Sequence, residues 1–331
     1  MSEYKEIHGQ SIQAVSSNPT NQFSGQIWYN KTTGKINMLG FSSTGTWATG
    51  ANMGNGRYTG ATAGTQTAAI AFGGGISVNT ESYDGSTWTN LPSSHNNPAM
   101  IQTDGTGTET SALLVAGGGY PEGYSDVLEY NGSSWTSGGN LGLAGYGVGA
   151  LGTQTAALAM GGKNWFFDQY RRVRTEHYDG TSWTQGGDMS TARLKMGTAG
   201  TETAGLIFAG GDTNYPYTKT NVTEEYNGTS WTSGGTYGTP AMGMASFGTQ
   251  TAAIGAGGGT YPASGGTSNS YSYDGSSWTA GGSLSSSREG NSGDGSTSAG
   301  FSIGGNPATG DSLRTEEWNG AGPVVLSLDA S

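Results

Sequence analysis

Cysteine is absent from the 331 residues of this chain, and only 11% of the residues are charged. Without cysteine the chain forms neither a disulfide nor a thiolate metal site, so packing alone must hold it together. Basic residues are few as well, since 13 Lys and Arg face 24 Asp and Glu for a formal net charge of -11. This charge favours solubility and argues against binding of nucleic-acid phosphates over any broad surface.

Long apolar runs are also missing. No run of 18 apolar residues exists, and the opening "MSEYKEIHGQ" has neither the basic nor the apolar region of a secretory signal. The sequence therefore predicts a soluble protein that does not insert into a membrane and is not exported by the general route.

Helical periodicity is the third absence. Of the residues, 62 are glycine and only 33% are hydrophobic. Gly, Ser and Thr are poor helix formers, and no window repeats apolar residues with a 3.6-residue period over several turns. We expect almost no helix, and short strands joined by turns instead.

The sequence does contain a repeat. Five tryptophans follow one another at intervals of 47, 48, 48 and 47 residues, in the range typical of propeller blades; they are Trp88, Trp135, Trp183, Trp231 and Trp278. A second phrase, small apolar residues between a turn and a glycine pair, occurs six times, at 64–74, 107–118, 152–162, 200–211, 248–258 and 295–305. The glycine pair suits a strand whose neighbours approach closely.

Each repeat is interpreted as four strands. In the third repeat these are 146–152, 155–162, 174–180 and 182–187. An Asp-Gly or Asn-Gly pair joins the last two strands in five repeats, and such a pair predicts a type I′ hairpin turn. The outer hairpin carries a Tyr and a Trp, and burial of a Trp removes roughly 150–250 Å² of surface from water, about 4–6 kcal/mol gross.

The sixth repeat lacks its own final strand, because Pro323 stands where its tryptophan is due. Trp47 precedes Gly64 by 17 residues, the interval that also separates Trp135 from Gly152. We therefore expect the N-terminal segment to complete the last blade, which removes unpaired edges. The alternative is that residues 323–328 form that strand.

The fold class that follows is all-β: a six-bladed kelch-like β-propeller closed by an N-terminal strand, with a short N-terminal arm. Six tryptophans are its expected structural anchors: Trp47, Trp88, Trp135, Trp183, Trp231 and Trp278. The predicted domains are an arm and hairpin over 1–40 and the propeller over 41–331.

The phrase "GALGTQTAALAMGG…TEHYDGTSWTQGGDMSTAR" resembles the kelch repeat, and the resemblance covers residues of about 44 to 320. Four residues separate Tyr178 from Trp183, where kelch repeats usually have six, so the outer hairpin is tighter. The wording "GQIWYNKTTGKIN…GTW…GTQTAA…EEYNGTSWTSGG" looks like the kelch-like proteins encoded by tailed phages of marine cyanobacteria and related ocean bacteria. That resemblance implies a virion or other phage-encoded structural protein.

One face of a propeller carries the loops that vary between the repeats. These loops gather aromatic residues and arginines, which are typical of binding hot spots on a rigid scaffold. The predicted binding residues are Tyr120, Tyr124, Trp165, Phe166, Phe167, Tyr170, Arg171, Arg172, Tyr215, Tyr217 and Tyr261. The alternative is that these aromatics fold back and cover glycine-rich blade edges.

Catalytic motifs are weak. The histidines are His8, His95 and His177, and no motif sets a nucleophile beside a base. Repeated acids such as Glu224 and Glu316 are interpreted as strand residues. We expect no enzyme activity, no cofactor and no metal; a glycan-processing propeller enzyme is the disfavoured alternative.

The predicted function is that of a non-enzymatic virion structural protein, of the tail or tail fibre, made in the host cytoplasm and acting in assembly or host-surface attachment. Residues 1–25 contain no copy of the repeat and would dock on other virion proteins, ordering on binding; the alternative is a disordered leader plus one extra hairpin on the sixth blade. The loop face would meet host-surface glycan or protein, and no nucleic acid. The main functional alternative is an intracellular phage-encoded scaffold that binds a host protein.

Overall fold

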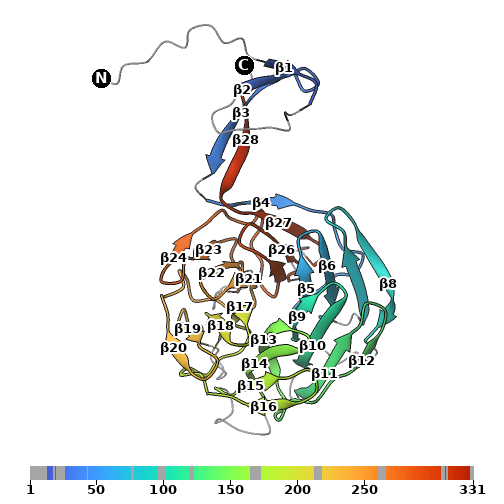
Figure 1. Cartoon of the computed structure of the whole chain (residues 1–331), viewed down its shortest axis with the longest axis vertical. Coiled ribbons are helices and arrows are strands. Elements are labelled where there is room, and N and C mark those ends of the chain that lie inside the picture. Colours follow the sequence, from blue (N-terminus) through green and yellow to red (C-terminus); the bar gives the residue numbers. More distant parts are fainter. Residues whose placement is uncertain are drawn as a thin grey trace. The chain divides into compact units, whose positions relative to one another are not determined.

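The structure is a computed structural model, and it describes residues 13–17, 19, 27–42, 44–75, 78–95, 102–118, 123–164, 173–211, 218–259, 266–306, 310 and 312–328. None of these residues is helical, and 28 strands account for the regular structure (Figure 1). The prediction of an all-β chain of short strands is confirmed. The chain divides into two compact units, one of Met1–Gly45 with Gly320–Ser331 and the other of Thr46–Asn319.

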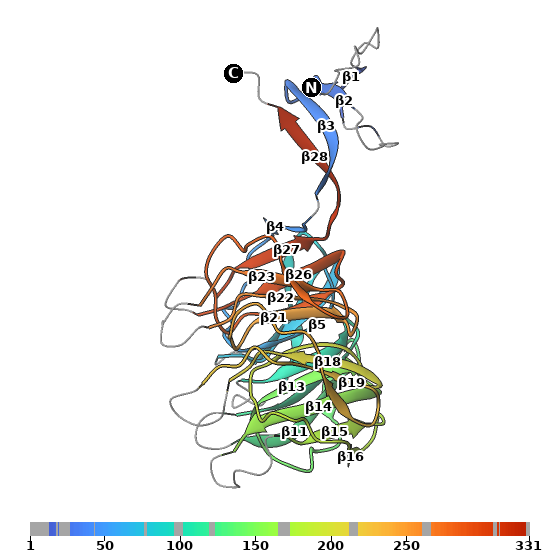
Figure 2. The same cartoon turned by 90° about the vertical axis from the view of Figure 1, so that its left-hand side faces the viewer.

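The larger unit contains six four-stranded antiparallel sheets, and Figures 1 and 2 show them radiating from a common axis in a propeller-like fold. From the axis outward, the first three sheets consist of β5 (Ala61–Thr65), β6 (Ala68–Phe72), β7 (Asn79–Tyr83) and β8 (Trp88–Ser94); β9 (Asp104–Thr108), β10 (Ser111–Gly117), β11 (Tyr124–Tyr130) and β12 (Trp135–Ser137); and β13 (Tyr146–Thr153), β14 (Ala156–Lys163), β15 (Thr175–Tyr178) and β16 (Trp183–Gln185).

The other three follow the same order. They consist of β17 (Gly197–Thr201), β18 (Ala204–Phe208), β19 (Thr223–Tyr226) and β20 (Trp231–Ser233); β21 (Ala245–Thr249), β22 (Ala252–Ala256), β23 (Ser270–Tyr273) and β24 (Trp278–Ala280); and β25 (Ser292–Gly295), β26 (Ala299–Ile303), β27 (Thr315–Asn319) and β4 (Thr46–Thr49). The third sheet thus has its four strands where the sequence predicts them.

The last of these sheets joins two distant parts of the chain. Its outermost strand is β4, which pairs with β27 so that Trp47 lies opposite Trp318. Strand β28 (Gly322–Leu328) pairs with β3 in the smaller unit. The alternative in which residues 323–328 form the outer strand is therefore wrong.

The innermost strands form a closed succession. Strands β5, β9, β13, β17, β21 and β25 each contact the next, and β25 contacts β5. Hydrophobic clusters fill the spaces between neighbouring sheets; one of them joins Phe72 and Ile70 of the first sheet to Leu114 and Tyr130 of the second. Alanine and glycine dominate near the axis because large side chains do not fit: a Cβ at Gly105 would lie 2.7 Å from the ring of Phe72.

The turn in the outer hairpins differs from the expected type I′ turn. In the first sheet a side-chain oxygen of Asp84 accepts the backbone N–H groups of Ser86 (2.8 Å) and Thr87 (2.7 Å). Only Gly85 has a positive φ, of +88°, so the prediction of two left-handed residues is wrong. The aspartate satisfies the turn with its side chain instead of its backbone conformation, and these bonds hold its pKa well below the usual range.

The tryptophans connect neighbouring sheets through their indole N–H groups. Trp135 donates to Oγ1 of Thr80 in the preceding sheet (2.8 Å), and Trp231 donates in the same way to Thr175 (2.9 Å). Trp183 donates to a backbone carbonyl, that of Gly139 (2.9 Å). Each of these three half-buried indoles therefore contributes both apolar surface and a directed bond between sheets.

Arginine and glutamate form buried pairs in three of the sheets. Arg57 lies 3.1 Å from Glu81, with side chains 2% and 1% exposed. Two further pairs follow the same pattern, Arg193 with Glu224 and Arg288 with Glu316. The structural interpretation of the repeated glutamates thus agrees with their contacts, although Glu224 and Glu316 are buried and not solvated.

The smaller unit is a sheet in the order β1 (Gln13–Val15), β2 (Ile27–Asn30), β3 (Lys35–Ser42) and β28, built from both ends of the chain. Strands β2 and β3 form the hairpin expected over 26–39. Trp28 is fully buried, while Ile27 (42%) and Tyr29 (38%) are exposed. Residues 320–331, which the sequence-based division assigns to the propeller, belong to this unit instead.

Candidate functional site: an axial channel

Most of the predicted binding residues fall outside the described part of the chain. These are Tyr120, Trp165, Phe166, Phe167, Tyr170, Arg171, Arg172, Tyr215, Tyr217 and Tyr261, and most of the predicted N-terminal arm also lies outside it. Tyr124 is described: it is half-buried at the start of β11, where its backbone forms a bridge with Gly145. The aromatic binding surface remains a prediction.

The residues that flank 165–172 border a cavity. Lys163, Asn164, Arg174 and Glu176 are among the residues that line this cavity of about 240 Å³. Nε of Arg174 lies 3.0 Å from Oε1 of Glu176. This cavity lies on the side of the sheets where β14 ends and β15 begins, the side that carries the predicted loops.

The structure reveals a second concave site that sequence reasoning missed, on the axis of the ring. At its mouth six residues share a left-handed backbone, with φ between +50° and +69°. Five of them lie two positions before an innermost strand and one lies at the second position of β13; they are Thr59, Gln102, Gly147, Lys195, Gly243 and Gly290. Their backbones bond from one sheet to the next, as in Lys195 N–H to Gly147 O and Gly243 N–H to Lys195 O, both 2.8 Å.

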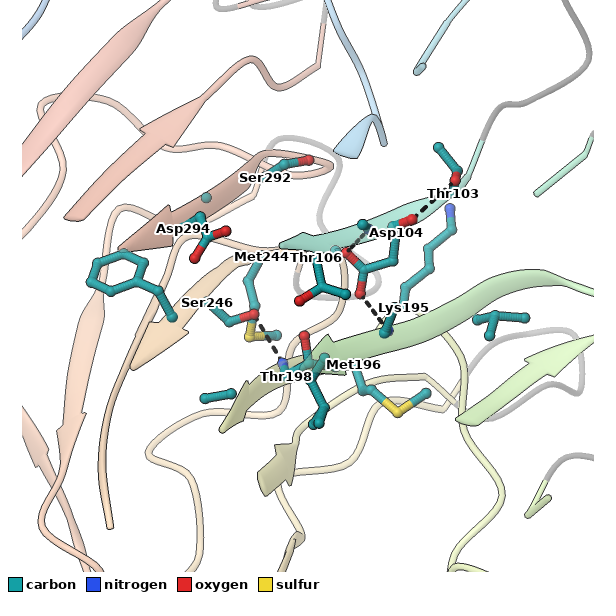
Figure 3. A pocket seen from close by; sticks show the side chains of 18 of the residues that line it. Thr103, Asp104, Thr106, Lys195, Met196, Thr198, Met244, Ser246, Ser292 and Asp294 are labelled. Atoms are coloured by element: carbon teal, nitrogen blue, oxygen red, sulfur yellow. Dashed lines mark hydrogen bonds between the residues drawn. The ribbon is translucent and has the colours of Figure 1, made fainter. Parts of the chain in front are cut away.

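This ring of backbone hydrogen bonds fixes the width of the mouth. Three of its six members are not glycine, although a left-handed conformation costs a side-chain-bearing residue free energy. The surrounding sheets therefore impose the conformation. All three line the cavity, and Figure 3 shows the side chain of Lys195 extending toward Thr103.

Two aspartates line the cavity below the mouth. In Asp104 one carboxylate oxygen accepts the backbone N–H of Ala150 (2.8 Å) and the other that of Gly105 (2.9 Å). Asp294 accepts the backbone N–H groups of Gly64 (3.0 Å) and Gly295 (2.6 Å). Each aspartate thus also bonds the backbone of a neighbouring sheet.

The low-dielectric surroundings change the protonation of these groups. Burial raises the pKa of Asp104 to about 6. Burial, with repulsion from Asp104, raises the pKa of Asp294 to about 7. Burial lowers the pKa of Lys195 to about 8, against the attraction of Glu289. Groups with such shifts in a cavity are candidates for function.

The wall between the charged groups is polar. It includes the hydroxyls of Thr106, Thr198, Ser246 and Ser292, and the cavity they enclose measures about 150 Å³. Most of these hydroxyls are anchored: Thr106 donates to Gly152 O (2.7 Å) and Ser292 to Gly60 O (2.6 Å). Their remaining lone pairs are available to a bound molecule.

Other titratable groups of the ring are engaged in contacts between sheets. His177 lies 2.7 Å from both Oε1 of Glu202 and the hydroxyl of Tyr226. Within the described ranges no group of three or more His, Cys, Asp or Glu side chains is placed to hold a metal ion. The same part of the chain contains no helix long and apolar enough to cross a membrane.

A signal for the channel is present in the repeat. Asp104 occupies a position where the other five sheets have Ala, Gly or Ser, and Asp294 occupies one where they have Ala, Leu, Phe or Thr. Lys195 stands where three repeats have glycine. A charged residue at a position where the other repeats have a small or apolar one points to a function once that position is known to lie on an innermost strand.

Comparison with known proteins supports the fold. No family profile matches the chain, and no curated protein matches it. The chain is similar to a solved structure described as "Structure of YjhT", with a TM-score of 0.68 and 14% sequence identity over 85% of this chain and 99% of that one. At this identity the similarity concerns the fold alone.

Proposed function

We propose that this chain is a six-bladed kelch-like propeller that serves as a non-enzymatic structural and attachment protein of a tailed-phage virion, in its tail or tail fibre. The six sheets of Thr46–Asn319 are its blades, with β4 closing the last of them. The division of the chain supports this proposal: both chain ends form one small sheet, and the whole ring is inserted between β3 and β28. One unit is thus available for attachment and the other for recognition.

The small sheet suits attachment to another virion protein. Ile27 and Tyr29 are exposed on adjacent positions of one face of β2, and the neighbouring hairpin strand places Ile36 and Met38 opposite them. Exposed apolar residues that share a sheet face are typical of interaction surfaces. Residues 1–25 would add to this contact.

The ring suits recognition without catalysis. Its buried glutamates are paired with arginines and its described strand histidine with a tyrosine and a glutamate, so these groups serve the scaffold. The mouth of the axial channel lies where the innermost strands begin, and the second strand of each sheet, which runs antiparallel to the first, ends on that same side. The described residues that flank the predicted loop 165–172, Asn164 and Val173, follow β14 and precede β15 there. That side would face host-surface glycan or protein.

Mass spectrometry of purified particles tests the proposal. We expect peptides of this chain at a fixed ratio to the major capsid protein, and the ratio would indicate tail or capsid placement. Complete absence from particles, with abundance in infected-cell lysate, would refute the virion role and favour the intracellular scaffold that binds a host protein.

A second experiment tests the recognition face. Replacement of residues 165–172 by a Gly-Ser segment of equal length should abolish adsorption of particles to host cells while leaving particle yield unchanged. A matched replacement in the outer turn, Asp179→Asn, should leave adsorption intact. Normal adsorption after the loop replacement would remove this loop from the proposal.

A further inference from the structure

The axial channel brings three charged side chains to one cavity without pairing them. Asp104 lies on β9, Lys195 precedes β17 and Asp294 lies on β25, so they come from alternate sheets around the ring. In Figure 3 the carboxylates of Asp104 and Asp294 lie between the innermost strands, and the side chain of Lys195 extends toward Thr103. Within the described residues none of the three takes part in an ion pair.

The two aspartates would accept hydrogen bonds from a bound molecule. Both oxygens of each carboxylate already accept one backbone N–H, which fixes the orientation of the carboxylate. Asp104 also accepts a bond from the side chain of Thr198, so one of its acceptor positions is taken. A carboxylate oxygen has a second lone pair, and an ionised carboxylate only accepts. A ligand that satisfies Asp104 and Asp294 must therefore carry O–H or N–H groups on two of its sides.

The lysine would donate hydrogen bonds to acceptor atoms of the same molecule. An ammonium group has three donors and no acceptor capacity, and Lys195 is influenced by Glu289 but is not bonded to it. One molecule must then donate to two walls and accept from a third. A hydroxyl group does both, so a molecule with several hydroxyls meets all three requirements.

The size and protonation of the site agree with a neutral ligand. A cavity of about 150 Å³ is comparable in volume to one that holds a six-membered ring. Burial raises the pKa values of Asp104 and Asp294 to about 6 and about 7, so charged and neutral carboxyls coexist near neutral pH. A hydroxyl bonds either form, because it accepts from a protonated carboxyl and donates to an ionised one.

We propose that the axial channel binds a small neutral polyhydroxylated molecule of the size of one sugar ring, whose hydroxyl groups donate to Asp104 and Asp294 and accept from Lys195. The hydroxyls of Thr106, Ser246 and Ser292 add further partners between these three. This site goes beyond the virion role and does not depend on it, since the isolated protein would bind the same molecule.

Binding of single sugars to the full chain tests the proposal. Saturation-transfer NMR and calorimetry with D-glucose, D-galactose and D-mannose, one at a time, should detect at least one of them with a Kd in the millimolar range. Lys195→Met and Asp294→Asn should each weaken it about tenfold, which is ~1.4 kcal/mol. Asp274→Asn, in an outer turn, should leave the affinity unchanged.

The variants separate binding from folding. Lys195→Met removes no ion pair of the described fold and keeps the length of the side chain. If Asp294→Asn has a lower melting temperature than the parent, the affinity of Lys195→Met for the sugar therefore provides the test. Absence of transfer to every sugar at about 50 mM, well above a millimolar Kd, would overturn the proposal. A second result would also overturn it: calorimetry that detects binding of CaCl2 or of glycine, lost in Asp294→Asn, while no sugar binds. The channel would then be a site for a cation or a zwitterion.

Discussion

Replacement of Glu224 by glutamine should destabilise the larger unit, because it breaks one of the buried Arg–Glu pairs. Glu224 pairs with Arg193, and the two side chains are 1% and 0% exposed. Its second oxygen accepts the backbone N–H of Ser190 (2.7 Å). The substitution removes one charge and leaves the buried guanidinium uncompensated.

The magnitude follows from what the guanidinium retains. Arg193 keeps its bonds to the carbonyls of Ala209 (3.1 Å) and Val222 (2.7 Å). The substitution removes the charge interaction and one of the two acceptor oxygens, so either Arg193 or the backbone N–H of Ser190 loses its bond to this side chain. Breaking a buried ion pair costs about 3–5 kcal/mol. Because Arg193 retains its bonds to the two carbonyls, we expect the unfolding free energy to fall by about 3 kcal/mol, the low end of this range. With an m-value of ~3 kcal/mol/M this lowers the urea midpoint by about 1 M.

Urea unfolding followed by tryptophan fluorescence measures the shift. Glu225→Gln is the matched control: Glu225 is half-buried and accepts one hydrogen bond, from Tyr273, so it should lose only about 1 kcal/mol. The double variant Arg193→Met with Glu224→Leu should recover most of the stability, because it removes both charges. A midpoint for Glu224→Gln within about 0.3 M of the parent would refute the reasoning.

Four further predictions concern residues of the ring. Trp47→Ala should lower the unfolding free energy by about 3 kcal/mol, the low end for a large-to-small change because the residue is half-buried; a parent-like melting curve would show that β4 does not close the last sheet. Thr223→Val removes the acceptor of the Trp278 indole N–H (3.0 Å) and should cost about 1–2 kcal/mol in urea unfolding, with Thr232→Val as an exposed control. The turn hydrogen bonds of Asp274 lower its pKa to about 2; its contribution to stability should be present above pH 4 and disappear as the pH falls through about 2, which an acid titration of Asp274→Asn against the parent would reveal as convergence of the two curves. Asp294 has the opposite sign. Because its pKa is raised to about 7, its contribution to stability is lost as the pH rises from about 4 through 7. At pH 8 the unfolding free energy of Asp294→Asn should therefore exceed that of the parent by on the order of a few kcal/mol, and a parent protein that melts at the same temperature at pH 4 and pH 8 would contradict this.

The repeat made the sheets predictable from the sequence. Tryptophans at a constant interval, together with the glycine pair, located all four strands of the third repeat within about two residues, because each repeat folds through local hairpins. The interval from Trp47 to Gly64 located β4 as well. These signals succeed since strand pairing between neighbours in sequence leaves a periodic pattern.

Contacts between side chains far apart in the sequence were not predicted. Arg193 and Glu224 are 31 positions apart, and nothing in the alternation of residues shows that they meet. The channel was missed because Asp104 and Asp294 are single departures within strands that otherwise repeat small residues, and their convergence depends on the closure of the ring. The turn type was wrong because Asp84 offered two ways to satisfy the turn, and its side chain provided the one that costs less backbone strain.

The pairing of β4 with β27 has a consequence for synthesis. Thr49 lies opposite Glu316, 267 positions later in the chain, so β4 leaves the ribosome long before its partner exists. At about 5–20 residues per second this interval lasts roughly 13 to 53 s. Five sheets can assemble in that time, while the last one waits with its edge uncovered. A nascent chain stalled before β27 should therefore expose a site for chaperones that the completed chain conceals.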